Sequence, residues 1–288
     1  MTDVLLVTCS EVPEGEEGGD LIVAELGRRG LSGVWAVWDD PDVDWAGARL
    51  ALVRSTWDYE RRRGEFLAWA HETSRLTTLV NTAAVLEWNT DKAYLLDLVD
   101  AGLPVVPTLD VADESELAPA IATFGTAVVK PRVGAGGRGV VLFDLEPGGP
   151  AGIDESQLDE GPWVVQPLVE SVRTEGETSV FVLGGEAVSQ VSKRPSGGEI
   201  RVHEEYGGSM DAVPLTDEAR ALAVRTVATA ERRLGTALPY ARVDLMRMDG
   251  GLVVSELEVT EPGLYLDVVP ANASAFAGVV AALLHTET

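Results

Sequence analysis

The sequence predicts an α/β protein with α+β character, made of an N-terminal parallel βαβ unit, a small central unit and a C-terminal unit with an antiparallel sheet. Three observations support this fold class. Apolar strands alternate with amphipathic helices through residues 4–80, which favours a parallel sheet covered by helices. A glycine-rich loop in the middle of the chain lies between two strand-like segments. Near the C-terminus, two apolar strands flank an Asp-Gly-Gly turn.

The composition indicates an acidic protein with a substantial core. The chain has 288 residues, of which 45% are hydrophobic, and its net charge is −25. This length suits two domains or one large one. The negative charge argues against nucleic acids and anionic membranes as partners, and an anionic substrate therefore needs a local basic pocket. With Cys9 as the only cysteine, no intrachain disulfide can form and a cysteine-based zinc site is not expected.

Targeting and membrane signals are not evident in the sequence. The N-terminus lacks a basic segment followed by an apolar run and a cleavage site. No stretch approaches the ~20 apolar residues that a membrane-spanning helix needs. We therefore expect a soluble, cytoplasmic protein.

The N-terminal elements follow one another as strand and helix. Strands are predicted at 4–8, 33–38, 50–54 and 79–80, and helices at 20–30 and 63–76. Ligands of parallel sheets bind beyond the carboxyl ends of the strands, where residues 54–59 (Arg-Ser-Thr-Trp-Asp-Tyr) lie. We interpret this polar, aromatic run as a substrate-side loop. A turn in which Ser55 or Asp58 caps the next helix is an equally good interpretation.

Lysine is used sparingly, at three positions only. Lys92, Lys130 and Lys193 are the only lysines among 22 basic residues. An ammonium group is a compact charge that reaches phosphate oxygens, and arginine replaces it poorly in a tight site. Lys92 is predicted in the first turn of a helix that ends near residue 101, where the positive helix end suits a phosphate. Coding bias explains a single lysine, but it explains three lysines in motif-like contexts less well.

The central unit is predicted to begin at Gly102-Leu103-Pro104 and to contain a helix at 113–123 and a strand at 127–131. Residues 134–139 then spell G-x-G-x-x-G, which indicates a dinucleotide site only when a helix follows. Here another strand follows at 140–143, so the loop caps a β-hairpin. Such a hairpin can fold over phosphates with its amides pointing inward. A flexible surface hairpin is the alternative.

The remaining segments complete the predicted order of elements. Residues 144–161 are acidic and rich in Gly and Pro, which indicates a surface excursion, and a strand at 163–169 passes through a proline suited to a hinge. A hairpin at 177–183 and 186–192 follows, with helices at 216–234 and 272–285 on either side of the C-terminal carboxylate hairpin.

That last hairpin carries charged residues at alternate positions. Arg242 and Asp244 share one face of the first strand, and Glu256 and Glu258 share one face of the second. With 249–251 as a three-residue loop, Asp244 lies opposite Glu256 and Arg242 opposite Glu258, whereas a two-residue loop would slip the register. Three converging carboxylates suit Mg²⁺. A solvated polar face is the alternative.

The order of two lysines, a glycine-rich hairpin, a hinge, a basic strand and Asp…Glu-x-Glu resembles the ATP-grasp ligases, from Asn81 onward. The segments 54–59 and 193–208 resemble the D-cycloserine-forming enzymes of that family, and D-alanine–D-alanine ligase and the RimK-type glutamate ligases are more distant likenesses. The resemblance implies an ATP-grasp fold with an N-terminal substrate-side domain (1–88), a central lid domain (89–172) and a C-terminal catalytic domain (173–288).

The resemblance also implies roles for individual residues, with ATP and two Mg²⁺ ions as cofactors and Mn²⁺ as a substitute. The nucleotide would be bound by Lys92, Lys130, Gly134, Gly136, Gly137, Arg138, Gly139, Gln166, Leu168, Val169 and Glu177. The metal ligands would be Asp244, Glu256 and Glu258, although many relatives have Asn at the position of Glu258. The catalytic cations would be Arg242, Arg201 and Lys193. The substrate would meet Arg54, Ser55, Thr56, Asp58 and His203, with a hydrogen-bonded structural role as the alternative for His203.

The implied activity is carbon–nitrogen ligation. A carboxylate is first phosphorylated by ATP, and an amine or aminooxy nitrogen then displaces phosphate. In a cycloserine-type reaction this nitrogen is the aminooxy group released from O-ureido-D-serine, and the product is a ring. The implied partner is a small, amino-acid-like carboxylate, and the family suggests a homodimer. One alternative is a nucleotide-binding protein without ligase chemistry, which would not need Arg242 and Arg201. Another is an NAD-dependent oxidoreductase, disfavoured by the missing helix after Gly139.

Overall fold

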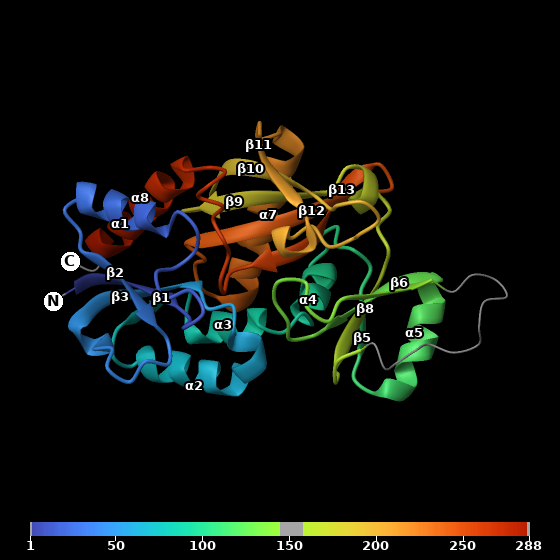
Figure 1. Ribbon diagram of the computed structural model, residues 1–288, viewed down its shortest axis with the longest axis horizontal. Coiled ribbons are helices and arrows are strands. Elements are labelled where there is room, and N and C mark those ends of the chain that lie inside the picture. The colour runs from blue at the N-terminus through green and yellow to red at the C-terminus, as the bar shows by residue number, and fades with distance from the viewer. Residues whose placement is uncertain (1, 145–157, 287–288) are drawn as a thin grey trace.

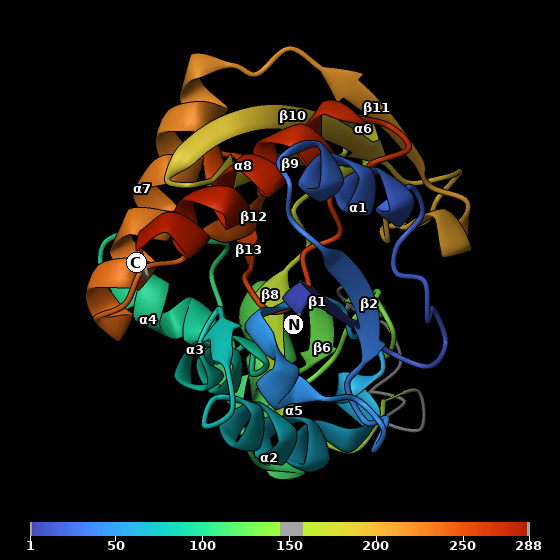
Figure 2. The ribbon, with the colours of Figure 1, turned by 90° about the vertical axis from the view of Figure 1, so that its left-hand side faces the viewer.

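The first part of the chain folds into a parallel sheet, as predicted. The computed structural model describes residues 2–144 and 158–286. Its first sheet has the order β2-β1-β3-β4 and contains β1 (Thr2–Thr8), β2 (Gly33–Val37), β3 (Ala48–Ser55) and β4 (Thr78–Val80). All three strand pairs are parallel. Alternate side chains of β1 and β3 point to opposite faces, so that α1 (Gly19–Arg28) and α8 (Ala271–Thr286) cover one face, and α2 (Arg63–Thr73) covers the other (Figure 2).

The central part is a four-stranded antiparallel sheet backed by one helix. The sheet has the order β5-β8-β6-β7, with β5 (Leu109–Val111), β6 (Thr126–Pro131), β7 (Val141–Asp144) and β8 (Trp163–Pro167). Helix α5 (Leu117–Phe124) packs on it through a small apolar cluster, at one end of the molecule (Figure 1). The glycine loop joins β6 to β7 as a hairpin, as predicted. Most of the predicted excursion at 144–161 lies outside the described residues.

The C-terminal part contains the largest sheet. It has the order β11-β10-β9-β12-β13, with β9 (Glu177–Leu183), β10 (Glu186–Arg194), β11 (Ser209–Val213), β12 (Tyr240–Met248) and β13 (Gly251–Glu258). Helix α7 (Asp217–Leu234) covers one face and α8 the other. Short helices lie at η1 (Trp45–Gly47), η2 (Tyr59–Arg62), η3 (Glu114–Glu116), α6 (Ser171–Thr174) and η5 (Glu204–Tyr206). Across the described residues, none of the helices has both the length and the apolar character needed to cross a membrane.

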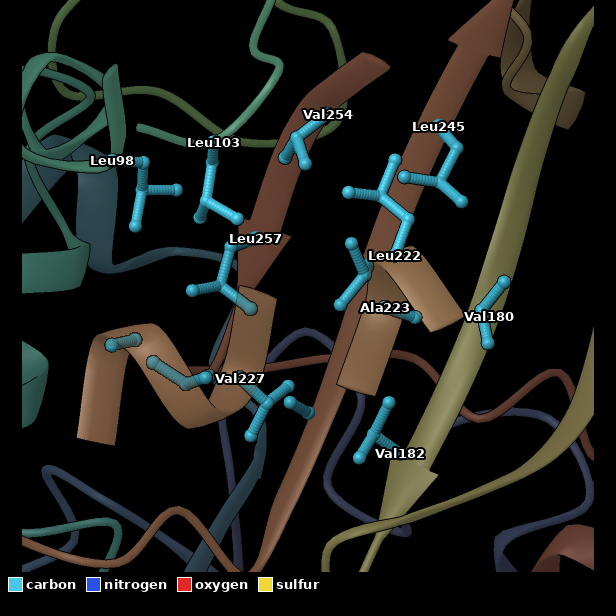
Figure 3. Close-up of a cluster of buried hydrophobic side chains, with 14 of the residues drawn as sticks. Leu98, Leu103, Val180, Val182, Leu222, Ala223, Val227, Leu245, Val254 and Leu257 are labelled. Carbon is cyan, nitrogen blue, oxygen red and sulfur yellow. The ribbon is translucent and has the colours of Figure 1, made fainter. Parts of the chain in front are cut away.

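The connection between the first and second sheets packs against the third. Helices α3 (Ala83–Asn89) and α4 (Tyr94–Asp100) lead to residues 103–105. Leu98 and Leu103 join the core formed by α7 and the strands of the C-terminal sheet (Figure 3). Val105 forms a parallel bridge with Val254 of β13. The central sheet is therefore reached from a segment that is anchored on the C-terminal sheet.

The start of α4 corrects one prediction. The helix begins at Tyr94, so Lys92 lies in the preceding turn and not in a first helical turn. The reason is the side chain of Asp91, which accepts the N–H of Ala93 at 3.0 Å and pairs with Arg132 at 2.7 Å. An Asp that bonds the backbone two residues ahead favours a turn over a helix. Lys92 is positioned by this turn.

The C-terminal hairpin has the predicted pairs but not the predicted loop. Asp244 lies opposite Glu256, and Arg242 opposite Glu258, as expected. The loop, however, has two residues: Asp249 and Gly250 have φ of 51° and 84°, and Met248 pairs with Gly251. This is the positive-φ pattern of a tight hairpin turn. The register then shifts by one between Leu245 and Asp244, a β-bulge at Ser255 that brings the charged pairs back to one face.

We expect Gly250→Ala to lower the free energy of unfolding by about 1–2 kcal/mol, because a Cβ is strained at positive φ. Gly251→Ala is the matched control: neither residue has an atom within 4 Å of a new Cβ, but only Gly250 has positive φ. Urea unfolding followed by circular dichroism measures both. Equal effects of the two substitutions would show that backbone strain at the turn does not matter.

Candidate active site

The three sheets meet around one large cavity. Its volume is about 590 Å³, within the range of ligand pockets. The N-terminal part contributes Trp57, the central part the glycine loop 134–138 and residues 166–169, and the C-terminal part residues 200–205 and the carboxylate hairpin. All three lysines of the chain line it. The few basic positions at which the sequence uses lysine and not arginine are therefore all at this cavity.

Buried charges from neighbouring strands form the floor of the cavity. Lys193, at the end of β10, is 1% exposed and lies 2.6 Å from Glu177 and 3.1 Å from Asp244. Lys193 and Glu177 are directly opposed in the β9–β10 ladder, so strand pairing positions them. Arg242 of β12 contacts Asp244 at 2.9 Å. The other carboxylate oxygen of Glu177 accepts the hydroxyl of the bulged Ser255 at 2.6 Å.

The carboxylates of the hairpin form one cluster with basic partners. Oxygen atoms of Asp244, Glu256 and Glu258 all lie within 4.8 Å of one another. Lys92 lies 3.0 Å from Glu256, and Arg242 also pairs with Glu258. Three convergent carboxylates are the hard oxygen donors that Mg²⁺ prefers. The donor set thus fits a divalent cation, and the surrounding cations fit phosphate groups.

The pKa values of the three carboxylates diverge. Burial alone would raise the pKa of Asp244, but Arg242 and Lys193 outweigh it and hold that pKa well below its ordinary value. Burial also opposes the charge of Glu256, yet Lys92 and Lys130 lower its pKa. For Glu258, burial dominates and raises the pKa well above its ordinary value, although Arg242 opposes the effect. Glu258 is therefore the carboxylate whose ionisation gains most from a bound cation.

The basic residues at the central sheet differ in their pairing. Lys92 donates to the carbonyl of Gly134 at 2.9 Å in addition to its pair with Glu256. Burial opposes its charge, but Glu256 outweighs burial and raises the pKa of Lys92. Lys130 is partly buried, with no carboxylate of the described residues within salt-bridge distance, and desolvation lowers its pKa. An ammonium in this state is stabilised by an incoming anion.

Residues 134–139 form a loop that lies across the cavity. Gly136, Gly137 and Gly139 have φ of 60°, 69° and 67°. Side chains are strained in this region, so glycine is required. Gly137 also lies against His203, because a Cβ on it would be 3.1 Å from His203 Nδ1. The loop therefore lies against residues 201–203 of the C-terminal part.

The segment that leaves β8 lines another side of the cavity. Gln166, Leu168 and Val169, which the family resemblance assigns to the nucleotide, all line the cavity. Gln166 donates to Thr108 Oγ1 at 2.9 Å, which holds its amide in place. Apolar side chains also line the cavity and offer surface against which a flat ring can pack; they are Val106, Val128, Val172, Met210 and Met246.

Of residues 54–59, only Trp57 lines the cavity. The predicted substrate residues Arg54, Ser55, Thr56 and Asp58 lie behind the cavity wall. Arg54 is fully buried, pairs with Glu16 at 2.6 Å and donates to the carbonyl of Pro262 at 2.7 Å. Ser55 and Thr56 are buried, and Asp58 accepts bonds from Trp38 at 2.9 Å and Arg62 at 2.6 Å. This segment supports the loop after β13.

Glu261 on that loop lines the cavity and was missed by the sequence analysis. Burial raises its pKa to about 7, with a further contribution from Glu256. The hydroxyl of Tyr59 bonds to its carboxyl group, and Trp57 Nε1 donates to its carbonyl at 3.4 Å. The available signal was its position three residues after Glu258, in a Thr-Glu-Pro-Gly segment at a strand end.

His203 lines the cavity but is not held as a hydrogen-bonded structural histidine. Its Nδ1 is buried and has no hydrogen-bond partner among the described residues. Burial, together with the charges of Lys193 and Arg242, lowers the pKa of His203 to about 4. The ring is therefore neutral at pH 7, with one nitrogen facing the glycine loop.

Comparison with known proteins covers nearly the whole chain. The family model for the N-terminal domain of D-cycloserine synthetase DcsG matches residues 4–81, and the model for the ATP-grasp domain of prokaryotic glutathione synthetase matches residues 98–268. The chain belongs to the ATP-grasp ligases. The fold class, the family and the enzyme class predicted from sequence are thereby confirmed.

Individual relatives of this ATP-grasp ligase agree. The cycloserine biosynthesis protein DcsG of Streptomyces lavendulae is 33% identical over 260 residues, which cover 85% of this chain and 86% of that protein. A crystal structure of D-cycloserine synthetase DcsG matches with a TM-score of 0.87 at 30% identity, over 98% of this chain and 99% of that one. A glutathione synthetase of Thermosynechococcus vestitus is 30% identical over 190 residues, 65% of this chain and 56% of that protein. D-alanine–D-alanine ligase from Bacillus anthracis, at 15% identity and a TM-score of 0.69, covers 99% of this chain and 97% of that one and shares the fold.

His203 should make stability depend on pH. The pKa of His203 is about 4 in the folded protein, against an ordinary value of 6.5. Its contribution to the free energy of unfolding is therefore fully present above pH 6.5 and is lost as the pH falls towards 4. We expect a loss of up to about 3 kcal/mol across this window. The measurement is urea unfolding at several pH values, without nucleotide or metal, for the wild type, His203→Gln and the control His71→Gln, which changes an exposed histidine. The same slope for His203→Gln and the wild type would contradict the expectation.

Proposed function

We propose that the protein uses MgATP to phosphorylate a small, amino-acid-like carboxylate and joins the acyl group to an amine or aminooxy nitrogen. The first substrate to test is O-ureido-D-serine. The observation that carries the proposal is the cluster of three carboxylates around the buried Lys193, Arg242 and Asp244, inside a cavity that the other two lysines also line. Similarity to a cycloserine biosynthesis protein over 85% of the chain supports the choice of substrate.

The nucleotide would lie between the central and C-terminal sheets. Lys92 and Lys130 would hold its α- and β-phosphates, with the glycine loop above them. The base would lie beside Gln166, Leu168 and Val169, against the apolar side chains that line the cavity. Glu177 would meet the ribose hydroxyls, although both of its oxygens already accept bonds from Ser255 and Lys193. The ribose contact therefore requires Glu177 to share one of these bonds or give it up.

The metal would be bound by Asp244, Glu256 and Glu258, and we propose two Mg²⁺ ions, with Mn²⁺ as a substitute. When bound, the metal neutralises phosphate oxygens and so stabilises the charge that moves during phosphoryl transfer. Arg242 and Lys92, which pair with these carboxylates in the structure, would then have N–H donors free for phosphate oxygens. This exchange of partners, from carboxylate to phosphate, explains why cations and carboxylates lie next to one another in the site.

The reaction needs charge stabilisation and the exclusion of water. The substrate carboxylate attacks the γ-phosphorus, ADP leaves, the nitrogen attacks the acyl carbon, and phosphate departs. Arg242, Arg201 and Lys193 would stabilise the transferring group. Water would hydrolyse the acyl phosphate, so the glycine loop must stay closed. On the sequence alone, we further propose a homodimer in the cytoplasm.

Substrate identity is tested by ADP release from MgATP with O-ureido-D-serine and with a panel of amino acids, singly and in pairs. We expect release with the ureido compound, together with a cyclic product detected by mass spectrometry. Release only with another carboxylate would retain the ligase and exclude the cycloserine-type reaction. Failure of MgATP to bind would contradict the proposed function itself.

Glu256→Gln should lower the rate of ADP release by at least about a hundredfold, because several kcal/mol of charge stabilisation is lost with one ligand. The substitution is nearly isosteric, so the thermal midpoint should stay close to that of the wild type. Glu218→Gln, an exposed change on α7, serves as the control. Full activity of Glu256→Gln would exclude Glu256 as a metal ligand.

A further inference from the structure

The glycine loop is bonded to the N-terminal part of the chain through one acidic residue. Glu60 lies in η2, directly after the segment that follows β3. Its Oε2 accepts the N–H of Ala135 at 2.8 Å, and its Oε1 accepts Nε of Arg138. Arg138 also donates from Nη2 to the carbonyl of Trp57 at 3.0 Å. We call these three bonds the closure contact.

The closure contact is partly shielded from water, mainly on the side of Glu60. The side chain of Glu60 is 10% exposed and that of Arg138 is 33% exposed. Hydrogen bonds between charged groups are stronger than neutral ones, and partial burial reduces screening of the charges. Burial opposes the charge of Arg138, but Glu60 outweighs it and raises the pKa of Arg138. The contact is therefore stronger than an exposed surface ion pair.

The contact holds the loop at Ala135 and Arg138. Between these two residues, a Cβ on Gly137 would lie 3.4 Å from Cδ of Arg201 as well as close to His203. Residues 134–138 line the cavity, whereas Glu60 does not. Glu60 thus acts on the cavity only through Ala135 and Arg138.

We propose that Glu60 is a positioning residue that holds the glycine loop closed over the cavity and couples its closure to residues 57–60. Arg138 then serves mainly to close the loop, although its place in the glycine motif predicts a contact with the nucleotide. Trp57 lines the cavity, and its carbonyl accepts a bond from Arg138. A substrate that contacts Trp57 therefore touches a residue that takes part in the closure contact. The reaction consequences rest on the proposed function; the contact itself does not.

The first experiment measures how often the glycine loop opens, and it does not depend on enzymatic activity. Trypsin cleaves after arginine, so the rate of cleavage after Arg138 reports how often the loop opens. We expect Glu60→Ala to raise this rate at least about tenfold, since charged hydrogen bonds are lost. Glu60→Gln should give a smaller increase, because its amide oxygen still accepts the N–H of Ala135. Mass spectrometry identifies the cut.

The control is Glu65→Ala, which removes the same charge five residues away. Glu65 lies on α2, is exposed and faces Arg62 at 3.6 Å, with no bond to the glycine loop. Its cleavage rate after Arg138 should match that of the wild type. Equal cleavage rates for Glu60→Ala and Glu65→Ala would overturn the proposal.

The second experiment separates closure from competition for Arg138. If Glu60 closes the loop, Glu60→Ala should weaken binding of a non-hydrolysable ATP analogue about tenfold, as measured by calorimetry. It should also raise the ratio of ADP to ligated product, because an open loop admits water. If Glu60 merely holds Arg138 away from the phosphates, Glu60→Ala should bind the analogue more tightly, which overturns the proposal.

A charge exchange completes the test. Glu60→Arg with Arg138→Glu should recover part of the protection from trypsin, measured at Arg132, which precedes the loop and is present in every variant. No recovery relative to Glu60→Arg alone would count against the pair. If the wild type does not bind the ATP analogue at all, the proposed function fails, and the proteolysis rates still decide the role of Glu60.

Discussion

Pairing of buried charges across strands is the constraint on which the cavity depends. Lys193 is 1% exposed, and its cost of burial is offset only because Glu177 and Asp244 lie beside it. Arg242 links Asp244 to Glu258 in the same way. Loss of Lys193 would leave Glu177 buried without a counter-charge, and loss of Arg242 would leave Glu258 without one, so each cation fixes where a carboxylate of the site lies. The residues of this network are neighbours because strand pairing makes them so.

Local patterns were enough to predict most of the elements and the charged face, but not the short β5, α6 and β11, nor how the register is achieved. The alternation of Arg242 with Asp244 and of Glu256 with Glu258 predicted the pairs that form. The loop was wrong by one residue, and the bulge at Ser255 compensates for it. The shorter loop and the bulge shift the register in opposite directions, so the charged pairs alone cannot reveal either of them. Ser255 shows why the bulge is useful, since its hydroxyl bonds to Glu177.

Contacts between distant segments account for what the sequence did not reveal. Arg54 looked like a substrate residue because it lies at the carboxyl end of a strand of a parallel sheet. Its partners are Glu16 and the carbonyl of Pro262, on separate parts of the chain, and they bury it behind the wall. Glu60 gave no signal because its partners, Ala135 and Arg138, lie in the central sheet's loop. Periodicity and motif spacing describe one segment at a time and cannot show such pairs.

The net negative charge of the chain explains why closure of the glycine loop matters for binding an anionic nucleotide. A protein of net charge −25 repels an anionic nucleotide from most of its surface, so attraction must come from cations inside the cavity. All three lysines are placed there. Those cations act most strongly when solvent is excluded, because the effective dielectric falls. Glu60 contributes to this although it is acidic: its charge is matched by Arg138, and the pair holds the loop over the lysines. Closure and electrostatic attraction therefore support each other, and an open loop would weaken both.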